Sequence, residues 1–434
     1  MTGENRTIGL FGAISIGIGG MVGGGIFAVL GEAVSLAHGA TAIAFMMAGI
    51  VALLTSYSYA KLSVTFQSRG GTVKFIDQAF GHNLLSGTVN LMLWLSYLIT
   101  ISLYAVAFSS YAQTFFSDIN APWIKHFFIC LAILLPAVIN YISTSFVSKS
   151  ETIIVLVKVI LLIVIIASSA SYVDVEKLSM EQWSSSFSIL VSGMVIFVAY
   201  EGFELIANAA EDIKNPQVNL AKAFYGSVVL VIILYVLIAI ITVGTVAEEQ
   251  LLAAKDYALA VAAEPALGKS GFTIVAIAAL LATFSAINAT IYGNSRLGFI
   301  LAKEGELPEV LAYEKRNIPT ADVILTALLS LIIANTIDLT AIAIIGSASF
   351  LLIFFIVNVA AYKLHKKIQA RKQIIFSACL VSALALITLL SYTFSNNPQA
   401  IFIFIAFIVT SIIFELIYGV KIRKHIFHRP YKTQ

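Results

Sequence analysis

The sequence predicts an all-α protein that crosses a membrane about twelve times, with the first ten helices arranged as two inverted repeats of five. Its 434 residues are 59% hydrophobic and only 11% charged, with a mean hydropathy of +0.96. A soluble protein carries about 25% charged residues. The apolar residues gather in twelve runs, and the first and sixth runs are interrupted near their centres. The composition therefore predicts the membrane helices, and the two interruptions predict the repeat.

Short loops separate the expected spans, which require about 20 apolar residues each. The spans cover residues 8–36, 39–65, 84–116, 124–142, 151–172, 187–212, 220–246, 271–302, 320–337, 339–362, 374–393 and 399–420. The interrupted spans are five apart, and an odd number of helices per half gives the two halves opposite orientations. We therefore expect one integral membrane domain over residues 1–434. Its parts are a first repeat at 8–172, a second repeat at 187–362 and two additional helices at 374–420.

Lysine and arginine are distributed unevenly between the two sides of the expected membrane. With the N-terminus inside, twenty of the 26 basic residues fall in inside loops and tails and four in outside loops, while Lys158 and Arg296 lie within spans. Such a bias marks the cytoplasmic side, so we expect both termini in the cytoplasm. The basic clusters at 363–372 and 421–432 are interpreted as topology signals in contact with anionic lipid, not as a nucleic-acid site.

Glycine is concentrated in the first span, where six glycines stand within the nine residues from Gly17 to Gly25. Each glycine inside a helix costs about 1 kcal/mol relative to alanine, so the helix is expected to break here. Unwound backbone at membrane depth occurs only where it is buried in protein or lines a polar cavity. The alternative is a packing motif, because small residues let helices approach closely. The sixth span is interrupted at Gly202, with Glu201 and Glu204 beside it.

The two interruptions offer partial charges of opposite sign. Free N–H groups at the start of a half-helix attract an anion, and carbonyl groups at the end of one attract a cation. A zwitterion with a carboxylate and an ammonium group a few ångströms apart fits such a pair. The N–H groups expected to bind the carboxylate are those of Gly23, Gly24, Gly25 and Ile26. The segment expected to bind the ammonium group contains Phe197, Ala199, Tyr200 and Gly202, although Gly202 serves only packing in the alternative interpretation.

Several motifs along the chain resemble those of the amino acid–polyamine–organocation (APC) superfamily of permeases. They are Gly23-Gly24-Gly25-Ile26-Phe27, Tyr57-Ser58-Tyr59-Ala60-Lys61-Leu62, Ala199-Tyr200-Glu201-Gly202-Phe203-Glu204, Ala210-Glu211-Asp212-Ile213-Lys214-Asn215-Pro216, Ser295-Arg296-Leu297-Gly298-Phe299 and Ala302-Lys303-Glu304-Gly305-Glu306-Leu307-Pro308. The resemblance covers nearly the whole chain and implies the LeuT-like five-plus-five fold. It is greatest to prokaryotic proton-coupled amino acid transporters of broad specificity, which implies a location in a prokaryotic plasma (inner) membrane.

Lys158 lies in the middle of the fifth span, where a lysine costs a few kcal/mol and marks a functional site. Burial disfavours its charged form, so the group is suited to bind and release a proton. The resemblance implies that its ammonium group replaces the cation of sodium-coupled relatives. Its partners would be carbonyls near Gly17 and Gly19 and the hydroxyl of Thr283 or Ser285. A lysine that snorkels to the membrane surface is the alternative, and similarly placed lysines also occur in exchangers.

Other polar and aromatic residues within spans are candidates for gating or specificity. Glu201 and Glu204 are three residues apart and are expected to share a helical face if a helix begins nearby. The resemblance implies that Glu204 links the site to a cytoplasmic gate. Glu201 would select cationic substrates, carry a second proton or bond to the first span. Trp94 and Tyr97, together with Phe197 and Tyr200, either cap the substrate or serve packing. Arg296 is expected to pair near the cytoplasmic end and to serve the gate.

The sequence thus predicts a secondary active transporter of amino acids, most simply a proton symporter in which Lys158 is protonated. An amino acid/polyamine exchanger is the nearest alternative, and a transporter-like sensor is the alternative from another class. We expect no enzyme, because no nucleophile–base set or phosphate-binding loop is present. No cofactor is implied, and none of the six histidines is expected to join a metal-ligand cluster. The expected partners are an amino acid, a proton and the bilayer, while the oligomeric state stays open.

Overall fold

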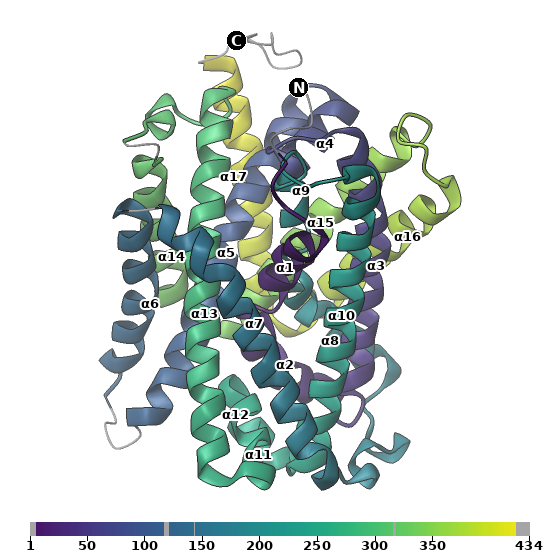
Figure 1. Cartoon of the computed structure of the whole chain (residues 1–434), viewed down its shortest axis with the longest axis vertical. Helices are drawn as coiled ribbons and strands as arrows, with labels where there is room; N and C mark the ends of the chain where they lie inside the picture. Colours follow the sequence, from purple (N-terminus) through teal and green to yellow (C-terminus); the bar gives the residue numbers. More distant parts are fainter. Residues whose placement is uncertain (1–5, 117–120, 143, 316–317, 422–434) are drawn as a thin grey trace.

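Helices form all the regular secondary structure of the described residues, which are 6–116, 121–142, 144–315 and 318–421 of a computed structural model. The long helices run roughly along one axis of the molecule (Figure 1). Apolar side chains are exposed on the outside of several helices. Examples are Leu156, Ile160 and Ile163 on one helix and Ile387 and Ile405 on two others. An apolar exterior of this kind is suited to contact with lipid, as the expected class of polytopic membrane protein requires.

The first half of the chain contains eight elements. They are α1 (Leu10–Met21), α2 (Gly25–Ala37), α3 (Thr41–Thr65), α4 (Gly71–Phe80), α5 (Leu84–Gln113), η2 (Thr114–Phe116), α6 (Trp123–Ile142) and α7 (Thr144–Ser169). Short 3-10 turns then lead into the second half: η3 (Ala170–Tyr172), η4 (Val175–Leu178) and η5 (Met180–Gln182).

The second half begins with α8 (Ser186–Val195), η6 (Ile196–Tyr200) and α9 (Leu205–Asn208). It continues with α10 (Pro216–Thr245), α11 (Glu248–Ala253), η7 (Lys255–Tyr257), α12 (Ala258–Ala262), α13 (Glu264–Lys303), η8 (Glu309–Ala312), α14 (Thr320–Thr336) and α15 (Leu339–Lys363). The last two helices are α16 (Lys372–Asn396) and α17 (Pro398–Lys421).

Ten helices of the described chain are long and apolar enough to cross a membrane, and the α1–α2 pair makes an eleventh span with a bend of 48°. The remaining expected span is α14, an apolar helix of 17 residues. Seventeen residues is the lower limit for a transmembrane helix. Each of these helices therefore lies where the sequence places a span, and the count of twelve spans remains a prediction.

The two halves interlock through equivalent helices. The helix after the first broken span, α3, packs against its counterpart α10, and α5 packs in the same way against α13. The molecule is thus an all-α, five-plus-five inverted repeat with discontinuous first and sixth spans, as predicted. The repeat boundaries at 8–172 and 187–362 remain predictions.

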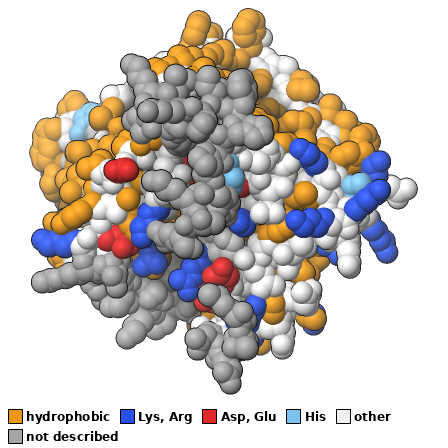
Figure 2. Space-filling model, turned by 90° about the horizontal axis from the view of Figure 1, so that it is seen from above, with side chains coloured by type: hydrophobic (Ala, Val, Ile, Leu, Met, Phe, Trp, Pro, Cys, Tyr) orange, Lys and Arg blue, Asp and Glu red, His pale blue; other side chains and the backbone are white. Residues whose placement is uncertain are grey.

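The two ends of the molecule differ. Helix α4 and the last described turn of α17 lie at one end, and α11 and α12 lie at the other (Figure 1). Lysine and arginine side chains gather on the end that carries α4 (Figure 2). This is the end that the sequence assigns to the cytoplasm.

The broken spans meet at two glycines. Gly202 has a φ of +113°, a conformation that L side chains rarely adopt. A Cβ atom on Gly20 would lie 2.6 Å from the Gly202 carbonyl oxygen, so the two backbones are in direct contact. Neither position has room for a side chain. The glycines in the first span therefore serve both of the roles considered for them, since they accompany a helix break and permit close packing.

A Gly20→Ala substitution should lower thermal stability, because the added methyl group collides with backbone that has little freedom to move. Overpacking of this kind costs roughly 1–3 kcal/mol. The matched control is Gly293→Ala in α13, where nothing lies within 4 Å of the added atom. It should keep or raise stability by up to about 1 kcal/mol, because alanine favours helix. Thermal unfolding of the purified protein in one detergent measures both, and equal melting temperatures would contradict the contact.

Candidate substrate site at the two broken helices

Helix α2 begins inside the protein. Gly24 is its N-cap, and no side chain caps the helix with a hydrogen bond. The first N–H groups of a helix have no partner within it and point out of its N-terminus. Ile26 is fully buried, and Gly24 and Gly25 lie against the ring of Tyr104 and the backbone of Ala199. The four residues predicted to bind a carboxylate thus surround a buried helix start, directly beside the sixth span.

The sixth span loses its α-helical form where the sequence predicts. Helix α8 ends at Val195, and η6 continues to Tyr200 before a turn leads into α9. Ser347 of α15 fixes this transition, because its hydroxyl donates to the Val195 carbonyl at 2.6 Å and accepts from the Val198 N–H at 2.9 Å. Backbone groups released by the break are therefore bound by a neighbouring helix.

Tyr235 of α10 joins the two broken spans. Its hydroxyl lies 2.6 Å from the Met21 carbonyl at the end of α1 and 3.2 Å from the Ala199 carbonyl in η6. Tyr235 is fully buried. The sequence analysis missed it, since a tyrosine in a long apolar span carries no distinguishing signal.

Glu201 and Glu204 do not share a helical face, contrary to the expectation. Helix α9 begins only at Leu205, and both carboxylates lie in the turn before it. Their side chains are buried, at 3% and 1% exposure. Each is met by a tyrosine of α5, since Tyr97 donates to Glu204 at 3.1 Å and Tyr104 to Glu201 at 3.4 Å. The spacing prediction failed because it assumed a helix where the chain is unwound.

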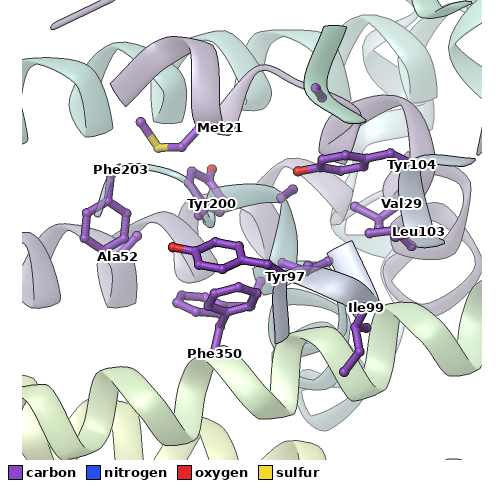
Figure 3. Close-up of a cluster of buried hydrophobic side chains, with 14 of the residues drawn as sticks. Met21, Val29, Ala52, Tyr97, Ile99, Leu103, Tyr104, Tyr200, Phe203 and Phe350 are labelled. Atoms are coloured by element: carbon purple, nitrogen blue, oxygen red, sulfur yellow. The ribbon is translucent and has the colours of Figure 1, made fainter. Parts of the chain in front are cut away.

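Glu204 also stabilises the turn itself, because its other carboxylate oxygen accepts the Gly202 N–H at 2.8 Å. Tyr97 and Tyr104 lie in one buried region together with Met21, Tyr200 and Phe203 (Figure 3). Helix α5 therefore contacts the unwound part of the sixth span through two hydroxyl groups. The sequence identified Tyr97 but not Tyr104.

The other candidate aromatics lie in packed surroundings. Trp94 donates to Asp322 of α14 at 3.3 Å, and that carboxylate is fully buried. Phe197 packs edge-on against Phe354, with ring centroids 5.9 Å apart. The Tyr200 hydroxyl donates to the Phe45 carbonyl at 2.8 Å. These contacts favour a packing role for the three side chains. The sequence had left two roles open for them, packing and capping of the substrate.

Lys158 points into the protein from a helix that faces outward on its other side. Its side chain is only 2% exposed, whereas Leu156 on the same helix is 60% exposed. This burial argues against snorkelling. Helix α7 packs against both α1 and α13, the helices predicted to provide its partners.

The predicted partners of Lys158 are also buried. Thr283 and Ser285 are 0% and 3% exposed, and the Thr283 hydroxyl donates to the Ala279 carbonyl of its own helix at 2.7 Å. Its lone pairs stay available to a cation. Gly17 and Gly19 are buried in α1, where Gly17 lies against Ser227 of α10.

Arg296 lies apart from this region. It is exposed, and its guanidinium group stacks 4.4 Å above the ring of Tyr292 on the same helix. Among the described residues we find no carboxylate paired with it. The ion pair expected for Arg296 is therefore not present among the described residues.

Comparison with known proteins defines the class of this molecule. Residues 8–414 match the model of the amino acid permease family. The chain belongs to this family, which is part of the APC superfamily. The predicted resemblance is confirmed, and the two broken spans are those of a family of amino acid transporters.

Individual relatives are similar over most of their length. The chain is 32% identical to the inner membrane transport protein YbaT of Escherichia coli, over 95% of this chain and 96% of the relative. It is 26% identical to the methylthioribose transporter of Bacillus subtilis, over 83% and 82% of the two chains. It is 25% identical to the branched-chain amino acid permease BcaP of the same organism, over 83% and 81%.

Replacing Tyr235 by phenylalanine should destabilise the junction of the two broken spans, because two buried carbonyl groups lose their shared donor. The expected cost is about 1–3 kcal/mol. Tyr225→Phe on the same helix is the control, since the Tyr225 ring only stacks on Tyr57 at 6.5 Å. Thermal unfolding should show a lower melting temperature for Tyr235→Phe alone, and equal effects of the two variants would refute a structural role for the bridge.

Proposed function

We propose that this protein is a proton-coupled amino acid symporter that binds its substrate between the two unwound segments. The observation that carries the proposal is the juxtaposition of an uncapped helix start at Gly24 with the unwound segment around Ala199. Membership of the amino acid permease family gives the substrate class. Fixed helix-end dipoles of opposite sign suit a zwitterion, because they require no charged side chain.

The substrate carboxylate would bind to N–H groups of Gly23, Gly24, Gly25 and Ile26. Its ammonium group would bind carbonyl groups of η6, where Ala199 already accepts from Tyr235 at 3.2 Å. Because the Tyr104 ring lies on Gly24, substrate entry requires that ring to move. Tyr104 is bonded to Glu201, so its movement would release a carboxylate beside the ammonium position. Glu201 would thereby favour substrates with a positive charge at this end.

Lys158 would carry the coupled proton. An ammonium group within the bilayer costs at least about 2.5 kcal/mol, so protonation has to be balanced by carbonyl or hydroxyl partners. Its helix packs on α1 and α13, and α1 ends at Met21, beside the proposed substrate site. In the protonated state Lys158 would hold α1 against α13, and in the neutral state α1 would be freer to move. A proton taken up outside and released inside would then drive the substrate inward.

The same geometry serves an exchanger if Lys158 keeps its charge throughout the cycle. In that case transport would need internal substrate and would not respond to a pH gradient. A transporter-like sensor would bind substrate without moving it. The experiments below separate these alternatives from symport.

Reconstituted protein should accumulate amino acid when the vesicle interior is made alkaline, and Lys158→Ala should abolish this response. We expect at least a tenfold loss of gradient-driven uptake, because the protonatable group is gone. The control is Lys269→Ala, which removes an exposed lysine of α13. Radiolabelled uptake with and without the gradient measures both variants. Full gradient-driven uptake by Lys158→Ala would show that the proton role is wrong.

A ligand screen should identify the substrate. Amino acids and polyamines added to purified protein are expected to raise its melting temperature when they bind, because a ligand that binds the folded state stabilises it. We expect stabilisation by amino acids with a free carboxylate and a free amino group, and none by their methyl esters or N-acetyl derivatives. Stabilisation by polyamines alone would contradict carboxylate binding at Gly23–Ile26.

We also propose that both termini are cytoplasmic and that the membrane is a prokaryotic plasma membrane. The basic end face in Figure 2 supports this orientation, because Lys and Arg accumulate on the cytoplasmic side. A C-terminal fluorescent reporter that is active only in the cytoplasm tests it.

A further inference from the structure

Four side chains meet near the end of the molecule that carries α4, three from residues 77–90 and one from more than two hundred residues further along the chain. Asp77 lies in the last turn of α4, His82 follows that helix, Asn90 lies in α5, and Glu306 follows α13. One ligand atom from each of Asp77, His82 and Glu306 lies within 4.8 Å of the others. The sequence analysis expected no histidine in a metal-ligand cluster, whereas the fold groups His82 with two carboxyl groups.

The cluster is largely withdrawn from solvent. Asp77 is 8% exposed, Glu306 3% and Asn90 1%. The His82 side chain is 26% exposed, which leaves a route from solvent to its ring. Two carboxyl groups and an imidazole so placed form a set of the kind that binds zinc.

The distances fit direct coordination. His82 Nδ1 lies 3.5 Å from Asp77 Oδ2. Tetrahedral zinc with bonds of about 2.0–2.1 Å separates neighbouring ligand atoms by about 3.4 Å. The separation of these two atoms therefore already suits two ligands of one zinc ion, and the third ligand atom lies within 4.8 Å of both.

Asn90 provides an independent observation. Its Nδ2 lies 3.0 Å from Glu306 Oε2 and 3.5 Å from Asp77 Oδ1, so the amide faces both carboxyl groups. Its Oδ1 is buried and makes no hydrogen bond within the described chain. Rotation of the amide by 180° would exchange the two atoms and turn Oδ1 towards the carboxyl groups. In that orientation Oδ1 would repel the carboxylate oxygens unless a cation or a proton lay between them, so it would be placed to act as a ligand of a bound cation.

We propose that Asp77, His82 and Glu306 bind a divalent transition-metal cation such as Zn²⁺, with Asn90 Oδ1 as a fourth ligand. A ligand set with an imidazole nitrogen favours zinc over magnesium or calcium, which prefer oxygen ligands throughout. This site is separate from the substrate site and does not depend on the proposed transport reaction.

A bound ion would also affect the sixth span. It would tie α4 to the segment that follows α13, and α4 packs against α5, α15 and α9. Asn208 of α9 lies directly against Gly71 at the start of α4. Stabilising α4 would thus hold the cytoplasmic half of the broken sixth span in place.

The test uses full-length protein without a histidine tag, treated with EDTA and then titrated with Zn²⁺ by calorimetry and with Co²⁺ by absorption. We expect one ion per chain and cobalt bands typical of tetrahedral coordination. His82→Gln and Glu306→Gln should each weaken binding at least tenfold. His365→Gln and Glu309→Gln are controls, since both residues lie outside the cluster and should leave binding unchanged.

Two further measurements keep the test decisive. The melting temperature of metal-free His82→Gln should equal that of the parent protein, because His82 is the most exposed member of the cluster. Zinc should raise the parent's melting temperature, and an excess of Mg²⁺ should not reproduce this. The proposal is overturned if the intact protein binds no zinc, or if His82→Gln and Glu306→Gln both bind it as tightly as the parent.

Discussion

The contact between the backbones of Gly20 and Gly202 is the constraint on which the centre of this molecule depends. A Cβ atom at either position would lie within 3 Å of backbone of the other, so two unwound segments come together only because neither carries a side chain there. The approach brings the end of α1 and η6 within reach of one tyrosine, Tyr235. The carbonyl and N–H groups freed by the two breaks thereby line one buried region instead of two separate ones.

The sequence predicted the fold well because its signals are local. Apolar runs and glycine interruptions are properties of single segments, and both broken spans lie where the pattern places them. The site was predicted less completely. The N–H groups at Gly24 followed from the helix break, but Tyr104, Tyr235 and Ser347 contribute hydroxyls through tertiary contacts that no spacing rule contains.

Two features of the structure that the sequence did not indicate have the same origin. Glu201 and Glu204 were assigned to a helical face, although the chain there forms a turn held by the Gly202 N–H. The grouping of His82 with two carboxyl groups was not expected, because Asp77 and Glu306 are separated by more than two hundred residues and by six expected spans. Local periodicity describes a residue's own element, whereas a site is made by elements that the fold brings together.

The packing of α3 on α10 and of α5 on α13 has a consequence for biosynthesis. Each half resembles a structural unit, yet the most extensive packing of its second and third helices is against the other half. The bond from Tyr200 to Phe45 closes a loop of 155 residues, and that from Tyr235 to Met21 a loop of 214. When the ribosome has completed only the first half, the glycine-rich stretch in α1 and α2 has no partner backbone. The first broken span can therefore reach its final packing only after α10 has been inserted into the bilayer.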